Sequence, residues 1–176
     1  MTIYEFEGKR PLIGKSTFIH PQAIIMGDVE IGEGCYIGAC SVIRGDFGRI
    51  VIGKGTNVQD LSMIHADRDT VAVIGDNVLI GHGAIVHGPC KLHDSVAIGM
   101  GAIVSVNTEI GIESMLAAGS LLAPGAVLPP GKLAIGSPAN KVQDLPENWR
   151  AWNKYGVREY QEMAERCIAG LKLISD

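Results

Sequence analysis

Aliphatic side chains return at every sixth residue along most of this chain. The series runs from Ile13 to Ile43, resumes from Ile52 to Ile64, and after a second break continues from Ile74 to Leu128. A small or β-branched residue usually stands four positions later, and glycine often follows the aliphatic residue directly. This spacing describes a short strand with one inward side chain, followed by a tight corner. The period therefore predicts a parallel β-helix in which each repeat contributes one strand.

The six-residue repeat resembles that of the hexapeptide-repeat proteins, which fold as left-handed β-helices. The resemblance implies three hexads in each coil of a triangular prism. It also supplies the left-handed winding, because crossover connections are right-handed by default. The high glycine content and the few aromatic residues fit a core of stacked aliphatic columns. We therefore expect an all-β solenoid over residues 1–140.

The period changes near Asp144, where apolar residues begin to fall close to a 3.6-residue spacing. This spacing predicts an amphipathic helix within residues 141–176. Its positions are Leu145, Trp149, Trp152, Gly156, Tyr160, Met163, Cys167 and Leu171. Pro146 suits the first turn, Asp144 with Glu147 resembles a capping pair, and Gly156 is a place for a bend or a split. We expect the helix to pack an apolar face on the prism or on a neighbouring subunit.

Composition narrows the range of partners. The 176 residues carry a net charge of −4 and a pI of about 5.7, which suits one soluble domain with an appendage. The chain has no basic stripe to neutralise phosphates, which argues against nucleic acid as a partner. Residues 1–15 lack an apolar run suited to secretion, and no stretch is long enough to span a membrane. We expect no membrane partner and a cytoplasmic location.

Three histidines occupy positions that the repeat fixes. Arg44, His65 and His87 each directly follow an aliphatic residue on the same prism face, so their side chains form one outward column. Coils lie about 4.8 Å apart, which lets two imidazoles tilt onto one zinc ion. His82 lies near another corner and diverges from this column. A neighbouring prism supplies it more naturally, which predicts a homotrimer with active sites between subunits.

Four segments around these histidines resemble the γ-class carbonic anhydrases in residue type and order. They are Arg44-Gly-Asp46, Asn57-Val-Gln59-Asp60, Ile64-His65-Ala66 and Gly81-His82-Gly-Ala-Ile-Val-His87-Gly88. The likeness covers residues 10–140, and the short loops with the Tyr-containing terminal helix look most like the PaaY-type and carnitine-operon-type branch. The resemblance implies that His65, His82 and His87 bind Zn2+. Fe2+ and Co2+ also accept three histidines.

The same resemblance implies roles for neighbouring polar residues. Gln59 would hydrogen-bond the metal-bound water or the substrate. Arg44 and Asp46 would form an ion pair across the subunit interface, where a desolvated pair fixes register; a solvated charge pair is the alternative. Asn57 and Asp60 would orient the ligands or line the interface, because metal ligands need oriented partners.

Two departures from the family pattern bear on activity. The best-known members carry a glutamate proton shuttle directly after the aspartate of the Arg-x-Asp motif, where this chain has Phe47. They also carry a long acidic loop after the first histidine ligand, where residues 67–73 fill the break here. Three neutral histidines lower the pKa of zinc-bound water to about 7, and the resulting hydroxide can convert CO2 to bicarbonate. Without the carboxylate, proton removal slows unless Asp67 or Asp69 substitutes.

The primary expectation is therefore a trimeric γ-type carbonic anhydrase, a carbonate dehydratase with slow hydration. Two other functions stay open from the residues. The same nucleophile attacks activated carbonyl groups, so the zinc site can instead hydrolyse a thioester such as an acyl-CoA, with Tyr160 closing the site around it. A metal-free hexapeptide acyltransferase would use one histidine as base and hold CoA along the subunit groove. Stoichiometric metal separates the first two from the third.

Overall fold

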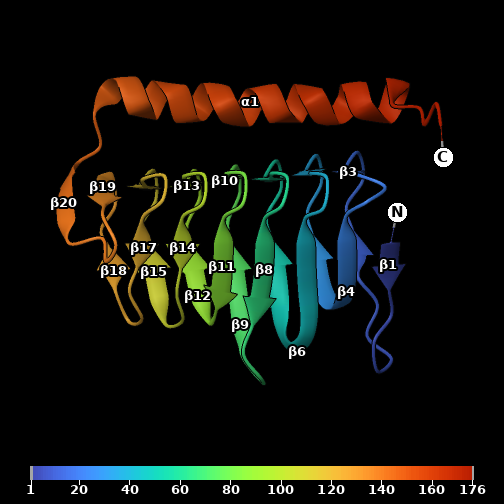
Figure 1. The fold of residues 1–176 in the computed structure, drawn as a ribbon, viewed down its shortest axis with the longest axis horizontal. Helices are drawn as coiled ribbons and strands as arrows, with labels where there is room; N and C mark the ends of the chain where they lie inside the picture. The colour runs from blue at the N-terminus through green and yellow to red at the C-terminus, as the bar shows by residue number, and fades with distance from the viewer. Residues whose placement is uncertain (1, 176) are drawn as a thin grey trace.

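The computed structural model describes residues 2–175, which form a left-handed parallel β-helix followed by one long helix (Figure 1). The strands are β1 (Thr2–Tyr4), β2 (Leu12–Ile13), β3 (Phe18–Ile19), β4 (Ile24–Ile31), β5 (Tyr36–Ile37), β6 (Val42–Ile52), β7 (Asn57–Val58), β8 (Met63–Ala66), β9 (Val71–Ile74), β10 (Leu79–Ile80), β11 (Ile85–Gly88), β12 (Cys90–Leu92), β13 (Ala97–Ile98), β14 (Ile103–Val104), β15 (Thr108–Ile110), β16 (Met115–Leu116), β17 (Leu121–Leu122), β18 (Val127–Leu128), β19 (Lys132–Ile135) and β20 (Lys141–Asp144). The helix is α1 (Glu147–Gly170). The solenoid and the terminal helix confirm the predicted fold class.

The prism has three faces, each a ladder of parallel strands. The histidine face contains β8, β11, β14, β17 and the first part of β6, and the second face contains β9, β12, β15, β18 and the last part of β6. The helix face contains β3, β5, β7, β10, β13, β16 and β19. β6 runs without a break around the corner between the histidine face and the second face.

The aliphatic residue of each hexad points inward and stacks on its equivalents. On the histidine face the buried column is Ile43, Ile64, Val86, Val104 and Leu122. Sterics explain why glycine often follows the aliphatic residue. A side chain at Gly99, for example, would collide with the backbone of Ala118 in the next coil. The repeat therefore specifies both the core and the spacing of the coils.

The segment after the prism begins as a strand, where the sequence predicted only helix. β20 pairs antiparallel with β19, and α1 starts at Glu147. Asp144 is not part of a cap: its carboxylate pairs with Lys132 in the sheet, and no side chain caps the helix at Pro146. The helix also continues through Gly156 without a split. No helix within residues 2–175 is both long and apolar enough for a membrane span.

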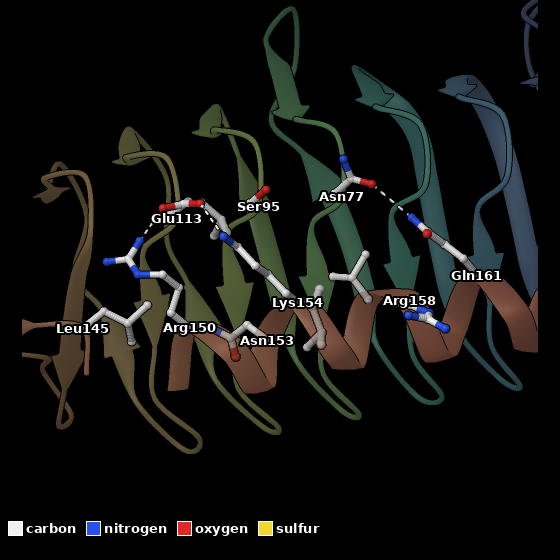
Figure 2. A pocket seen from close by; sticks show the side chains of 12 residues that line it. Asn77, Ser95, Glu113, Leu145, Arg150, Asn153, Lys154, Arg158 and Gln161 are labelled. Carbon is white, nitrogen blue, oxygen red and sulfur yellow. Dashed lines mark hydrogen bonds and ion pairs between the residues drawn. The ribbon is translucent and has the colours of Figure 1, made fainter. Parts of the chain in front are cut away.

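α1 runs back along the helix face, from the end near β19 toward β3 (Figure 1). Val157 packs on an apolar cluster of the prism. Along one edge of the helix, Arg150 and Lys154 pair with Glu113, and Gln161 donates to Asn77 (Figure 2). This polar edge fastens one side of the helix to the prism.

Candidate metal centre

Two of the three candidate ligands lie side by side on the histidine face. The parallel register of β8 and β11 sets His65 opposite His87, and that of β6 and β8 sets Arg44 opposite His65. The Nδ1 atom of His65 lies 3.2 Å from the Nε2 atom of His87. His65 is buried, whereas His87 is partly exposed. The column that the repeat predicts therefore brings two ring nitrogens together at the surface.

The distance between these nitrogens fits a shared zinc ion. Zinc takes histidine nitrogens at about 2.0–2.1 Å in tetrahedral geometry, which places two such nitrogens about 3.3 Å apart. The observed 3.2 Å between His65 and His87 agrees with that separation. The separation of the two nitrogens thus suits half of a tetrahedral donor set.

Asp46 fixes the orientation of His65. Its Oδ1 lies 2.9 Å from Nε2 of His65, and its Oδ2 accepts a hydrogen bond of 2.5 Å from Arg44. Partial burial works to raise the pKa of Asp46, but the hydrogen bonds from His65 and Arg44 outweigh it and hold the pKa below its usual range. With the Nε2 proton directed at this carboxylate, Nδ1 is left to act as a ligand.

Arg44 and Asp46 form an ion pair within one chain, because residues two apart on β6 project to the same side. The ion pair expected across the subunit interface stays a prediction. Asp46 also contacts His65, a contact that was not expected from the sequence. The pair therefore acts on the ligand column of its own chain.

His82 lies at the corner between the helix face and the histidine face. Its Nδ1 is 3.3 Å from Oδ2 of Asp60, and its Nε2 is 3.2 Å from the hydroxyl of Tyr160 on α1. Asp60 is itself held by the backbone N–H of Ala39 at 2.7 Å. Burial, and then the charge of Asp60, raise the pKa of Tyr160. A carboxylate and a phenol thus orient this imidazole from two sides.

His82 does not join the other two histidines within one chain. It precedes β11, whereas His65 and His87 stand near the ends of β8 and β11. Among residues 2–175, no three His, Cys, Asp or Glu side chains of one chain are grouped closely enough to hold a metal ion. A single subunit therefore presents two donors on one edge of the histidine face and one donor at the opposite corner.

Gln59 and Asn57 form a buried polar pair at the end of β7. Gln59 donates from Nε2 to Oδ1 of Asn57 over 3.0 Å. The Nδ2 atom of Asn57 is buried without a hydrogen-bond acceptor among the described residues. Because Val58 is paired with Ile80, Gln59 lies beside Gly81, next to His82. The pair thus adjoins the third candidate ligand.

Phe47 and Arg68 meet at the corner beside the histidine column. The guanidinium of Arg68 lies 4.9 Å from the centre of the Phe47 ring, and that ring lies 5.8 Å from the ring of His65. The nearest further carboxylate is that of Asp67, with Oδ1 3.9 Å from Nε2 of His87. The aromatic ring of Phe47 therefore lies beside His65 and brings no carboxylate to this side of the histidine column.

A large apolar groove opens between α1 and the helix face. Its volume is about 890 Å³, and its floor and walls are largely apolar. Among the residues that form it are Leu79, Ala97, Met100, Met115, Trp149 and Trp152. Gln59, His82 and Tyr160 line the same groove. The sequence gives only a weak signal of it, the two tryptophans within the helix.

Known proteins resemble this chain over nearly its whole length. Residues 10–45 and 72–105 match the bacterial transferase hexapeptide model of six repeats. The carnitine operon protein CaiE of Escherichia coli K12 is 37% identical over 171 residues, which covers 97% of this chain and 87% of CaiE. A hexapeptide transferase family protein from Anaplasma phagocytophilum has a TM-score of 0.88 at 35% identity, covering 93% of this chain and 96% of that one.

A crystal structure from Bacillus cereus, of the product of the BC4754 gene, is also similar. It has a TM-score of 0.92 at 36% identity and covers 96% of this chain and 97% of its own. Because the three proteins are similar over 93–97% of this chain, the similarity includes the terminal helix as well as the repeats.

Proposed function

Because this chain belongs to the bacterial hexapeptide-repeat family, in its CaiE-like branch, we propose that it is a zinc-dependent γ-type carbonic anhydrase with active sites between the subunits of a homotrimer. The observation that carries the proposal is the 3.2 Å separation of His65 Nδ1 and His87 Nε2, which suits two zinc ligands. His82 of the partner subunit would complete the set. Fe2+ and Co2+ are compatible with the same donors.

His65 and His87, with His82 of the partner subunit, would hold the zinc ion, which would supply a nucleophile for CO2 at neutral pH. The residues of this chain have supporting roles around that reaction. Asp46 orients His65 through Nε2 and leaves Nδ1 to face the metal. Asp60 orients His82 through Nδ1, with Nε2 beside the hydroxyl of Tyr160. Gln59, beside His82, offers an amide group to substrate oxygen.

Removal of the product proton limits the expected rate. Phe47 stands against His65, where it has no group to accept a proton. Asp67, 3.9 Å from His87, is the carboxylate best placed to do so. Positioned general bases contribute factors of about 10²–10⁴, so we expect hydration well below that of enzymes with a dedicated shuttle.

The proposal is tested by ¹⁸O exchange between CO2 and water, catalysed by the zinc-loaded trimer. We expect exchange above the buffer background that disappears in Gln59→Ala and in His82→Ala. Gln22→Ala, at an exposed position next to His20 and not to the three candidate ligands, is the matched control and should exchange as the wild type does. Exchange at the background rate in the zinc-loaded wild type would reject CO2 hydration.

A second candidate, hydrolysis of an acyl thioester, is favoured by the apolar groove that reaches Gln59 and His82. In this reaction water adds its oxygen to the thioester carbonyl carbon, the carbon–sulfur bond breaks, and the sulfur leaves as a thiol with the second proton. Tyr160, whose hydroxyl lies 3.2 Å from His82, would donate that proton to the leaving sulfur. A groove of about 890 Å³ is far larger than CO2 needs. Measuring thiol release from acetyl-CoA and ¹⁸O exchange on the same protein separates the two functions.

A further inference from the structure

The turn between β8 and β9 lies directly on the bend of β6, at the corner beside the histidine column. Residues 67–70 form this turn, which projects beyond the neighbouring corners of the prism (Figure 1). The backbone N–H of Asp69 donates to the carbonyl of Phe47 over 3.2 Å. A side chain at Gly48 would collide with the carbonyl oxygen of Asp67. The backbone of β6 therefore holds this turn in place.

Arg68 belongs to this turn, and its cation rests on an aromatic ring. The guanidinium carbon lies 4.9 Å from the centre of the Phe47 ring, within the range of a cation–π contact. The same ring lies 5.8 Å from the ring of His65. The cation can therefore lie no farther from this imidazole than the two distances together. Phe47 is 49% exposed and Arg68 is exposed as well, so solutes can reach the cation.

The charges around Arg68 leave it open to an anion. Within the described part of the chain, its side chain forms no ion pair with the flanking carboxylates of Asp67 and Asp69. Asp67 is instead near His87, with Oδ1 3.9 Å from Nε2. A guanidinium has five N–H groups in a planar fork, and the aromatic ring below it takes none of them as a hydrogen-bond acceptor atom would. These N–H groups are available to a ligand.

We propose that Arg68, held on Phe47, forms a binding site for small planar oxyanions beside the candidate metal centre, and that bicarbonate is the anion it takes. The choice of bicarbonate rests on the first proposed function, because bicarbonate is the product of CO2 hydration. Two parallel N–H groups of a guanidinium suit two oxygen atoms of one planar anion. Chloride has no second atom to accept the second bond, and CO2 carries no charge for the cation to attract.

Nuclear magnetic resonance tests the site without metal or turnover. The backbone N–H signals of residues 67–70 are followed in metal-free protein while bicarbonate, acetate or chloride is added at constant ionic strength. We expect saturable shifts with bicarbonate and with acetate, and severalfold weaker binding of chloride. No saturable shift with bicarbonate, or equal affinity for chloride, would overturn the inference.

Variants separate the charge from the geometry of the site. Arg68→Lys keeps the charge and loses the planar fork, whereas Phe47→Leu keeps an apolar side chain and loses the ring. We expect bicarbonate to bind about five- to tenfold more weakly to each variant. Arg166→Lys, at an exposed arginine of α1, is the matched control and should bind as the wild type does. Bicarbonate affinity like that of the wild type in both Arg68→Lys and Phe47→Leu would exclude the site.

Product inhibition connects the site with the proposed function. In the zinc-loaded protein, we expect Arg68→Met to raise the bicarbonate concentration that halves CO2 hydration by about tenfold. The value of kcat/KM for CO2 should stay unchanged, because an uncharged substrate does not use the cation. A lower kcat/KM with unchanged inhibition would refute the anion site.

The two levels of the proposal fail in different ways. If the metal-free protein binds bicarbonate through Arg68 but the zinc-loaded wild type hydrates no CO2, the first proposed function is wrong and the anion site stands. If the wild type hydrates CO2 but the signals of residues 67–70 do not respond to bicarbonate, the function stands and the anion site is wrong.

Discussion

The prism and the terminal helix differ in how much of their apolar surface is buried. From Ile19 onward the coils of the prism bury their inward aliphatic residues, as Ile64 and Val86 show, and adjacent coils are joined by backbone hydrogen bonds. In α1 only Asn153 and Ala164 are buried, and the two tryptophans remain largely exposed. The prism therefore positions the candidate ligands, whereas the helix controls what reaches them.

The largest expected effect on folding comes from breaking the prism. Ile64→Ala deletes a fully buried side chain directly before His65, so we expect a loss of about 2–5 kcal/mol in the free energy of unfolding. Val127→Ala, which removes an exposed side chain, should cost less than about 0.5 kcal/mol. Chemical denaturation measures both. Equal losses would contradict the difference between core and surface positions.

Replacing Asp46 by Asn is expected to weaken zinc binding without unfolding the prism. The change removes the carboxylate that orients His65 and leaves Arg44 without its partner. Loss of such an orienting group typically costs 10–100-fold in metal affinity, measured by competition with a chelator. Asp144→Asn, which removes an exposed carboxylate paired with Lys132, is the control. Wild-type affinity in the Asp46 variant would show that His65 needs no such partner.

Tyr160→Phe should have a smaller effect, confined to the contact between helix and site. The variant loses the hydroxyl that lies 3.2 Å from His82 but keeps the ring that packs on Tyr36. We expect about 0.5–1.5 kcal/mol less stability and a larger drop in thioester hydrolysis than in CO2 hydration. A uniform drop in both rates would place Tyr160 in a purely structural role.

The smallest effect concerns the polar edge of the helix, and it depends on pH. A hydrogen bond from Lys154, together with the charges of Lys154 and Arg150, lowers the pKa of Glu113. A lowered carboxylate pKa adds stability above about pH 4.3 and loses it as the pH falls through the folded value. Glu113→Gln should thus cost less than about 1 kcal/mol at pH 7, and this cost should shrink as the pH falls through the folded pKa. A cost that does not change between neutral and acid pH would contradict the ion-pair account.

The six-residue period was sufficient to predict the prism and the column of Arg44, His65 and His87, because a strict repeat fixes which residues stack. β20 was missed because its four residues are all exposed and so carry no hydrophobic pattern. The contact between Asp46 and His65 was missed because it depends on how β6 turns the corner, which no spacing encodes. The groove was not predicted because Trp149 and Trp152 are equally compatible with a helix that packs on the prism and with one that packs on a neighbouring subunit.

We expect edges of two different subunits to form one metal site, and a mixing experiment tests this most directly. His82→Ala and His87→Ala chains are each purified, then unfolded and refolded together, and zinc is counted per trimer by mass spectrometry. Each variant alone should hold almost no zinc. A mixed ring of three contains one interface where intact His65 and His87 face an intact His82, so about one zinc ion per mixed trimer is predicted. Mixed trimers without zinc, or stoichiometric zinc in the His82→Ala protein alone, would contradict the account.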